Sequence, residues 1–308
     1  MASKNHGGER ITTSATMINR QRKAKWDEFN YVTAVAVIGM HLLCVFAPFM
    51  FSWEGLKVAI GLDLISRFLG VNLSYHRQLS HKSFKLPKWL EYTFAYCGVQ
   101  ALQGNPIFWV RIHRFHHQYV DTESDPHTPI KGFWFSHVLW MLDTTNSSNI
   151  ANTIGEENNN NVRDLEKQFF YRFVRRTYIA HPIALALVLY ALGGLPFIVW
   201  GMGVRIVLGY HMTWLVNSVC HGYGDQTWDT KDLSLNNRWL GVLGFGEGWH
   251  HNHHAFKYSA RHGLEWWQVD ITWYLIRLLE VIGLASNVKL PTAVDIQRKA
   301  LRLKDLSS

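Results

Sequence analysis

The stretch YVTAVAVIGMHLLCVFAPFMF, residues 31–51, runs for about 21 positions without a formally charged side chain. A helix of about 20 apolar residues crosses the roughly 30 Å hydrocarbon core of a bilayer, so this stretch is predicted to be a membrane span. Residues 1–29 ahead of it are polar and basic. They are predicted to form a cytosolic tail, because they are too short, and the apolar run too long, for a cleaved secretory signal.

A second apolar run covers about residues 56–74 and is interrupted by Asp63 and Arg67. Charged groups at membrane depth are costly unless they pair or face the protein interior. These two residues are spaced i,i+4, which would bring their side chains together on one helix face. The run is therefore predicted to be a second span that carries an internal ion pair.

The third and fourth runs cover about residues 178–196 and 197–220. Gly193, Gly194 and Pro196 lie where the two runs meet, and glycine and proline are the residues that most often end or turn a helix. The cluster is predicted to form a hairpin turn. The four runs together predict two helical hairpins in the membrane.

Two hairpins would leave the N-terminal tail, residues 75–177 and the residues after 221 on the same side of the membrane. These segments hold nearly all of the Lys and Arg residues, and positive charge gathers on the cytosolic side. The expected fold is therefore an all-α integral membrane domain over residues 30–285, with a cytosolic helical cap and a polar C-terminal tail over residues 286–308. We expect the endoplasmic reticulum membrane, because no Ser/Arg-rich import presequence is recognisable.

Composition supports a chain that meets both lipid and water. Hydrophobic residues make up 48% and charged residues 18%, yet the mean hydropathy is only -0.07, so much of the chain must lie in water. The net charge of +8 comes without a nucleic-acid-binding motif. We therefore expect an anionic membrane surface, and no nucleic acid, as the partner of the basic residues.

Seventeen histidines stand out, and many of them lie in three short motifs. The motifs are HRQLSH (76–81), HRFHH (113–117) and HHNHH (250–254). The last two share the pattern HxxHH, whose three positions lie on one helix face and could aim three imidazoles at one place. Eight or more imidazoles exceed the four ligands of a closed zinc site, so two metal ions are predicted.

Five longer stretches carry a resemblance to a known family. They are HRQLSHKSF, HRFHHQYVDTESDPH, FSHVLW, TWLVNSVCHGYG and EGWHHNHHAF. Their sequence and order, over about residues 30–280, resemble the membrane stearoyl-CoA (delta-9) desaturases and especially their plant acyl-lipid members. The resemblance implies an oxygen-dependent enzyme that inserts a cis double bond, expected at delta-9, into a saturated acyl chain carried on CoA or a glycerolipid.

The resemblance also implies which residues hold the metal. Two Fe²⁺ ions are expected, with O₂ as co-substrate, since imidazole also suits zinc and copper but an acyl C–H bond needs activated oxygen. Asn217 would hold a metal-bound water. Asp125 and Glu247 are expected to orient imidazole N–H groups. The implied histidine ligands are His76, His81, His113, His116, His117, His221, His250, His253 and His254.

Other residues have implied roles outside the metal ligands. Gln103, Trp109 and Thr213 correspond to residues that shape the bend of the acyl tunnel, and Arg111 to one that contacts the headgroup. No catalytic residue beyond the metal ligands is expected. The remaining histidines are expected to be structural, exposed or otherwise outside the ligand set: His6, His41, His127, His137, His181, His211, His251 and His262.

Electrons must come from a separate partner, because the HPGG-type signature of a fused cytochrome b5 domain is absent from the sequence. Cytochrome b5 and its NADH-dependent reductase are the expected donors. Two alternatives stay open at this point. A lipid or alkane hydroxylase could use the same histidine framework, and a non-enzymatic membrane metal-binding protein would instead place ionisable residues along a path inside its spans.

Overall fold

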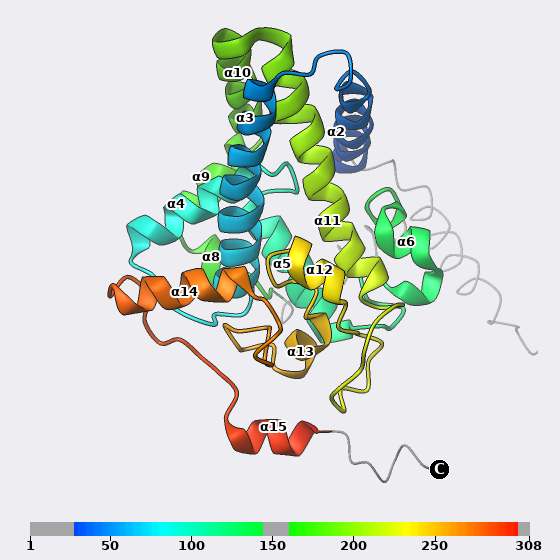
Figure 1. Cartoon of the computed structure of the whole chain (residues 1–308), viewed down its shortest axis with the longest axis vertical. Helices are drawn as coiled ribbons and strands as arrows, with labels where there is room; N and C mark the ends of the chain where they lie inside the picture. Colours follow the sequence, from blue (N-terminus) through cyan, green and yellow to red (C-terminus); the bar gives the residue numbers. More distant parts are fainter. Residues whose placement is uncertain (1–27, 144–159, 301–308) are drawn as a thin grey trace, which may run out of the picture.

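Long apolar helices rise from one side of a layer of shorter helices, as Figure 1 shows. The computed structural model describes residues 28–143 and 160–300, and these residues form helices with isolated β-bridges but no strand. The expected all-helical fold is therefore confirmed for the part of the chain that is described. The basic tail, residue His6 and most of the Asn-rich segment near residue 155 lie outside it.

The first two long helices form a hairpin. Helix α2 (Glu28–Val45) ends before the predicted limit at residue 51. Pro48 explains the early end, because proline disfavours helical backbone at the residue before it and removes a backbone donor. Ser52 then caps α3 (Trp53–Asp63) by accepting a hydrogen bond from the Gly55 amide at 2.9 Å. The chain continues from α3 into the π-helical segment η1 (Leu64–Ser80).

The second hairpin turns at Gly194, whose φ of +64° is a left-handed conformation that glycine adopts readily. The turn lies inside α10 (Ala180–Ile198), which leads through η4 (Val199–Val204) into α11 (Arg205–Val219). A Cβ placed on Gly201 of η4 would come within 2.8 Å of the Leu189 side chain of α10. The chain therefore folds back on itself, as the glycine and proline cluster predicted.

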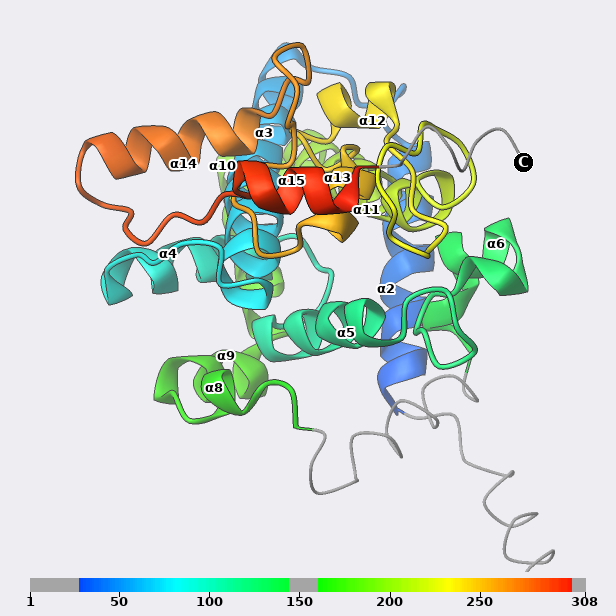
Figure 2. The same cartoon turned by 90° about the horizontal axis from the view of Figure 1, so that it is seen from below.

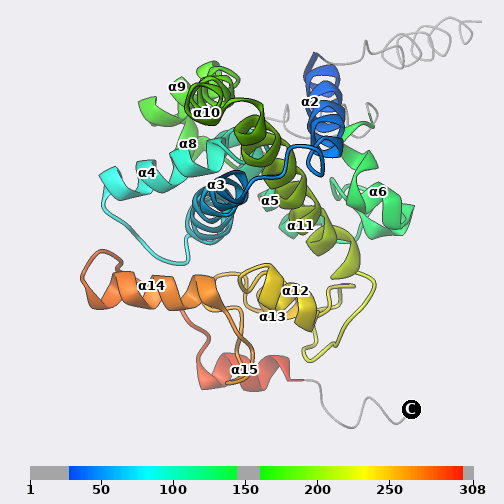
Figure 3. The ribbon, with the colours of Figure 1, turned by 45° about the horizontal axis from the view of Figure 1, so that its top comes forward.

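Both hairpins pack into one bundle. Figure 3 shows α11 between α3 and α2, and both neighbours contact it. A buried cluster that includes Val37, Met202 and Ile206 joins α2 to η4 and α11. Among the described residues, one helical segment, Ala180–Val219, is long and apolar enough to cross a membrane, and Tyr31–Val45 is a shorter apolar helix.

Short helices form the cap below the bundle. Figure 2 shows α4, α5, α14 and α15 lying across the direction of the upper helices. The cap holds the remaining helices of the described residues, with these bounds: α4 (Lys88–Val99), α5 (Pro106–Tyr119), η2 (Pro129–Lys131), α6 (Phe133–His137), η3 (Leu139–Met141), α8 (Arg163–Glu166), α9 (Phe169–Thr177), α12 (Arg238–Leu243), α13 (His250–Ala255), α14 (Ile271–Val281) and α15 (Ala293–Lys299).

Candidate metal centre

Four segments bring the histidine motifs together at the junction of bundle and cap. HRQLSH spans the end of η1, the two HxxHH motifs lie on α5 and α13, and His221 is the second residue after α11. Helix α5 starts with Pro106 behind Asn105, whose side chain caps the Phe108 amide at 3.1 Å. This proline and cap fix where α5 begins and thereby which of its residues face the centre.

The nine predicted imidazoles gather in two groups. Each group has one ring nitrogen per residue within 4.8 Å of all the others in the group. Each HxxHH motif contributes to both groups, which differs from the expectation that a motif aims its three rings at one place. One group is His76, His81, His113, His117 and His253, and the other is His116, His221, His250 and His254.

Within each group the Nε2 atoms face one another. The Nε2 atoms of His81 and His113 are 2.7 Å apart, and those of His76 and His253 are 3.1 Å apart. In the other group the Nε2 atoms of His221 and His250 are 3.0 Å apart. The rings therefore converge on two small volumes rather than stacking as an ordinary aromatic core.

Carboxylates lie behind four of the rings, on the Nδ1 side away from the convergent Nε2 atoms. Two were expected from the sequence, and Asp121 and Asp232 were not, because no spacing pattern links either residue to its histidine. The Nδ1-to-carboxylate distances are 2.5 Å for His76 and Glu247, 3.0 Å for His116 and Asp125, 3.0 Å for His221 and Asp121, and 3.2 Å for His254 and Asp232. Such contacts fix the tautomer and the orientation of a ligand imidazole.

The arrangement of His116 and His254 shows why this set of ring nitrogens suits a cation. His116 and His254 each have Nδ1 next to a carboxylate, so a neutral ring places its proton there and presents a lone pair at Nε2. Those two Nε2 atoms lie 3.3 Å apart. Facing lone pairs repel each other, and a metal ion that accepts both would relieve the repulsion.

The electrostatic surroundings keep seven of the nine rings neutral and the Glu247 carboxylate charged. Burial, with smaller contributions from neighbouring imidazoles, lowers the pKa of seven of the rings: His81, His113, His116, His117, His250, His253 and His254. Burial alone would raise the pKa of Glu247, but His76 and Arg77 hold it below its usual value. Neutral imidazoles and charged carboxylates are the forms that bind metal and support its ligands.

Glu247 is itself held by a buried cation. Arg77 donates from Nε and Nη2 to Oε1 of Glu247 at 3.1 and 3.0 Å, and from Nη1 to Asp270 at 3.0 Å. The Arg77 side chain is fully buried, so both of its carboxylate partners are needed to compensate its charge. The network anchors the His76 side of the centre to the segment before α14.

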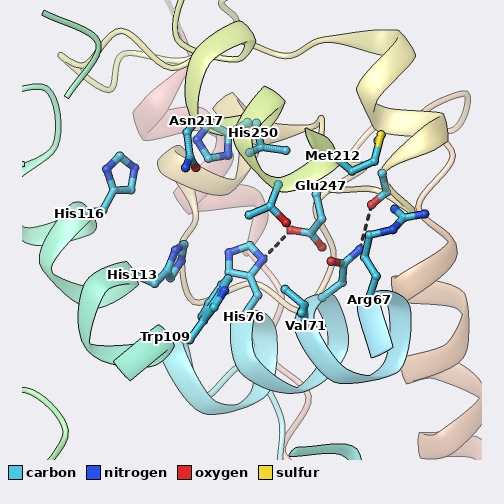
Figure 4. Close-up of a pocket in the computed structure, with 14 residues that line it drawn as sticks. Arg67, Val71, His76, Trp109, His113, His116, Met212, Asn217, Glu247 and His250 are labelled. Atoms are coloured by element: carbon cyan, nitrogen blue, oxygen red, sulfur yellow. Dashed lines mark hydrogen bonds and ion pairs between the residues drawn. The ribbon is translucent and has the colours of Figure 1, made fainter. Parts of the chain in front are cut away.

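A large cavity reaches the centre from the bundle. Its volume is about 740 Å³, and His113 and Asn217 line it together with α2 and residues near Tyr178. Figure 4 shows Asn217 beside His250, and His113 beside Trp109. Asn217 therefore lies where the cavity and the histidine groups meet.

The three residues expected to shape a tunnel bend are joined by hydrogen bonds in that cavity wall. Oε1 of Gln103 accepts hydrogen bonds from Trp109 Nε1 at 3.4 Å and from Thr213 Oγ1 at 3.2 Å. The Trp109 ring stacks on His113, with centroids 5.1 Å apart. Arg111 lines the same cavity and donates to Glu166 at 3.1 Å, beside Arg175.

His251 lies outside the two groups although it stands between two of their members in sequence. Its Nε2 accepts a hydrogen bond from the Trp228 amide at 2.9 Å, and its Nδ1 is 2.9 Å from the Ser234 hydroxyl. Its ring is therefore committed to the loop that precedes α12.

Six more histidines are ordered by contacts that the sequence did not indicate. His127 and His262 each lie close against a ring of the metal groups, with centroids 4.3 Å from His116 and 4.5 Å from His253. A separate chain of ring nitrogens runs from His41 through His211 to His137, with steps of 3.2 and 3.1 Å. His181 contacts Thr177 at 2.9 Å, away from the centre.

A family model for fatty acid desaturases matches residues 55–280. Palmitoyl-monogalactosyldiacylglycerol delta-7 desaturase, a chloroplastic protein of Arabidopsis thaliana, is 58% identical over 296 residues, covering 94% of this chain and 78% of the relative. Delta-9 acyl-lipid desaturase 1 of the same plant is 47% identical over 304 residues, covering 97% and 98%.

An acyl-CoA 5-desaturase of Anemone leveillei is 53% identical over 277 residues, covering 90% of this chain and 85% of the relative. The three relatives act on acyl chains but differ in the carrier and in the bond position that their names give. Their common chemistry is oxidation of a lipid substrate, and the histidine groups described above are suited to the metal centre of such a reaction. The chain belongs to the fatty acid desaturase family of oxidoreductases.

Proposed function

We propose that this protein introduces a cis double bond at delta-9 of a saturated fatty acyl chain, with two Fe²⁺ ions held by the nine histidines. One observation carries the proposal. The two groups of convergent imidazole nitrogens adjoin a cavity of about 740 Å³ through His113, which belongs both to a group and to the cavity wall. The arrangement supports a substrate that reaches the metals from the bundle.

The proposed reaction converts a –CH₂–CH₂– unit, O₂, two electrons and two protons into a cis –CH=CH– unit and two waters. When bound, the iron pair would supply the oxygen activation that breaks an unactivated C–H bond. The histidines of the two groups would hold the iron pair, and Asn217 would hold a water bound to it. The chain's own contribution is to position the acyl chain and to exclude water from the reacting carbons.

Positioning falls to the wall around Trp109. The shared acceptor Gln103 holds Trp109 and Thr213 in one arrangement, so a flexible acyl chain meets a rigid surface beside His113. A rigid wall favours one methylene pair next to the metal ligands. The cis geometry would follow from a bend of the chain at this wall.

The acyl carrier would lie beside the arginines of the cavity wall. Arg111, Arg175 and Arg176 line the cavity, and the first two donate to Glu166. Guanidinium groups suit either the phosphates of CoA or a polar lipid headgroup. We propose that the acyl chain is carried on a glycerolipid or on CoA. We place the double bond at delta-9 because the relative covered over 98% of its length is named a delta-9 desaturase. A bond at delta-7 is the alternative, and product analysis would distinguish the two positions.

We further propose four membrane crossings with the centre on the cytosolic face of the endoplasmic reticulum. The apolar segment 180–219 has 40 residues, about twice what one crossing needs. Exposed apolar side chains such as Val35 on α2 and Leu192 on α10 would face lipid. Cytochrome b5 with its NADH-dependent reductase would then supply the electrons from the cytosol.

Expression in a desaturase-deficient yeast tests this function. Gas chromatography with double-bond localisation should find a new cis-monoenoic acid in cells that express the protein, and none with a His254→Ala variant. Hydroxylated acyl products would favour the hydroxylase alternative instead. Fluorescence microscopy of a tagged protein in plant cells tests the compartment, because a chloroplast signal would contradict the endoplasmic reticulum assignment.

A further inference from the structure

Two histidines outside the metal groups face each other between two long helices of the bundle. His41 lies on α2 and His211 on α11, and their Nε2 atoms are 3.2 Å apart. Inside a metal group, the Nε2 atoms of His116 and His254 are separated by a similar 3.3 Å. The pair on the long helices therefore repeats a spacing that is found within the candidate metal centre.

Both rings are also held at their other nitrogen. His41 Nδ1 donates to the Val37 carbonyl at 2.7 Å, and His211 Nδ1 lies 3.1 Å from Nε2 of His137. The Trp214 ring is stacked on His41, with centroids 6.3 Å apart, and meets His211 edge-on at 5.2 Å. A ligand imidazole commonly donates its second ring N–H to a carbonyl, a carboxylate or water. The two rings are thus oriented as ligand rings are, with both Nε2 atoms directed at one point.

The positions of the hydrogens at the two ends of this row of rings follow from their partners. The Val37 carbonyl can only accept, so His41 carries its hydrogen on Nδ1 and a neutral ring presents a lone pair at Nε2. At the other end, the Ser218 hydroxyl donates to the Trp214 carbonyl at 2.9 Å and lies 3.0 Å from His137 Nδ1. The single hydroxyl hydrogen is committed to that carbonyl, so His137 donates to Ser218 from Nδ1.

The hydrogen of the middle ring follows from that of His137. A neutral His137 with its hydrogen on Nδ1 has a lone pair at Nε2, which accepts from His211 Nδ1. His211 then also presents a lone pair at Nε2, and this lone pair faces the one on His41. Two facing lone pairs repel each other, and a cation bound to both nitrogens would remove the repulsion.

The pair lies within helices that we propose as membrane spans. Ionisable side chains in such helices are costly and usually have a functional role. Val35 and Leu42 of α2 are 71% and 61% exposed, whereas His41 and His211 are half-buried where α2 and α11 are in contact. An ion could therefore reach the two nitrogens from the edge of the bundle.

We infer that His41 and His211 form a cation site, separate from the nine-histidine centre, that takes a divalent ion of the zinc class and fastens α2 to α11. Two Zn–N bonds of about 2.0–2.1 Å at a tetrahedral angle place the nitrogens roughly 3.3 Å apart, close to the spacing found here. Imidazole nitrogen suits such ions, whereas Mg²⁺ and Ca²⁺ prefer oxygen ligands. Water or a small anion would complete the coordination, so the ion would exchange more readily than in a site with four protein ligands.

Zinc uptake by protein whose nine-histidine centre is already filled with iron tests the site. Purified protein is brought to equilibrium with Zn²⁺ by dialysis, and zinc and iron are then counted by metal analysis. Wild type should take up about one zinc per chain without losing iron. Zn²⁺ should also raise the melting temperature, because a ligand that binds only the folded state stabilises it, and Mg²⁺ at the same concentration should not.

His41→Gln and His211→Gln should each abolish both the additional zinc and the thermal shift, while the iron content stays at the wild-type value. The two variants change different helices, so one remains informative if the other does not fold. His181→Gln is the matched control. His181 is also half-buried and lies at the start of α10, where it contacts Thr177 at 2.9 Å. This control should behave as wild type.

No zinc beyond the nine-histidine centre of wild type would mean that His41 and His211 share an ordinary N–H···N hydrogen bond, which would overturn the inference. Uptake that both variants retain would place the ion elsewhere, and uptake matched by loss of iron would be exchange at the centre. Either result also contradicts the site. The comparison of wild type with the variants does not depend on the reaction that the centre performs, so its outcome stays separate from that of the proposed function.

Discussion

The Nδ1 atom of His76 lies 2.5 Å from Oε2 of Glu247, while the Nε2 atom of the same ring faces His253 at 3.1 Å. One ring is thus held by a carboxylate on one side and directed at the candidate metal position on the other. The same arrangement recurs at three more rings. The roles of these carboxylates can therefore be tested by substitution, as those of the histidines can.

Glu247→Gln should weaken metal retention by roughly 10- to 100-fold, because the amide no longer fixes the His76 tautomer by charge. The expected result is faster loss of iron to a chelator, measured by metal analysis of the purified protein after timed dialysis. Glu265→Gln changes an exposed carboxylate in the segment before α14 and serves as the control. Equal retention by the two variants would show that Glu247 does not support the ligand.

His254→Ala and His113→Ala should each abolish desaturation, although the two residues belong to different groups. Reaction at a metal pair needs both groups complete. His251→Ala should keep its metal and much of its activity, because His251 bonds to Trp228 and Ser234 instead. Metal analysis and product yield, measured on the same preparations, would contradict the ligand assignment if His251→Ala lost as much iron as His254→Ala.

Trp109→Ala should scatter the position of the double bond and lower the rate steeply, because near-attack geometry is sensitive to shifts of about 1 Å. Metal content should stay close to wild type, since Trp109 stacks on His113 without being a predicted ligand. Trp239→Ala, at a side chain that is 79% exposed, is the control. Full activity at one unchanged position would make Trp109 an ordinary wall residue.

The Asp63–Arg67 pair, in which Arg67 Nη2 lies 2.6 Å from Asp63 Oδ2 and both side chains are at most 10% exposed, should behave differently when it is broken and when it is replaced. Asp63→Leu alone leaves a buried guanidinium without its partner, which costs about 3–5 kcal/mol in known buried pairs, whereas replacing both charges is often near neutral. Thermal unfolding in detergent should therefore rank the Asp63→Leu and Arg67→Met double variant above the single variant. The opposite order would mean that the two side chains do not compensate each other.

His251 gives a pH dependence with a definite sign. Burial lowers its pKa from 6.5 to about 4. Between pH 6.5 and about pH 4 the His251 ring is protonated in the unfolded chain but neutral in the folded protein. Its contribution to the free energy of unfolding is therefore complete above pH 6.5 and is lost as the pH falls. The loss is on the order of 3 kcal/mol.

The measurement is the melting temperature of the metal-free protein between pH 7 and pH 5. His251→Gln cannot titrate, so its melting temperature should fall less steeply with pH than that of wild type. Parallel curves for the two proteins would show that another group controls the decline.

Several features could be predicted because they depend on local spacing or residue type. The Asp63–Arg67 pairing follows from i,i+4 geometry, and the hairpin turn follows from the backbone freedom of Gly194. Eight of the nine histidines that gather in the two groups stand in the three motifs, whereas His221 was indicated only by the family resemblance. These features need no knowledge of how distant segments pack.

The division of each HxxHH motif between two groups could not be predicted in the same way. Helical spacing places His113 and His116 on one face, but side-chain rotamers and the approach of α13 decide which ring meets which partner. Asp232 supports His254 from a loop with no pattern of its own. The end of α2 at Val45 shows that absence of charge is a weaker guide to helix length than Pro48.

The most direct test of the central claim is double-bond localisation by gas chromatography and mass spectrometry on yeast lipids, paired with iron analysis of the purified protein. We predict about two irons per chain and a cis-monoenoic product with its bond at delta-9, both lost in His254→Ala. One zinc per chain and no iron in active protein, or a hydroxylated acyl product from iron-loaded protein, would contradict the di-iron desaturase account.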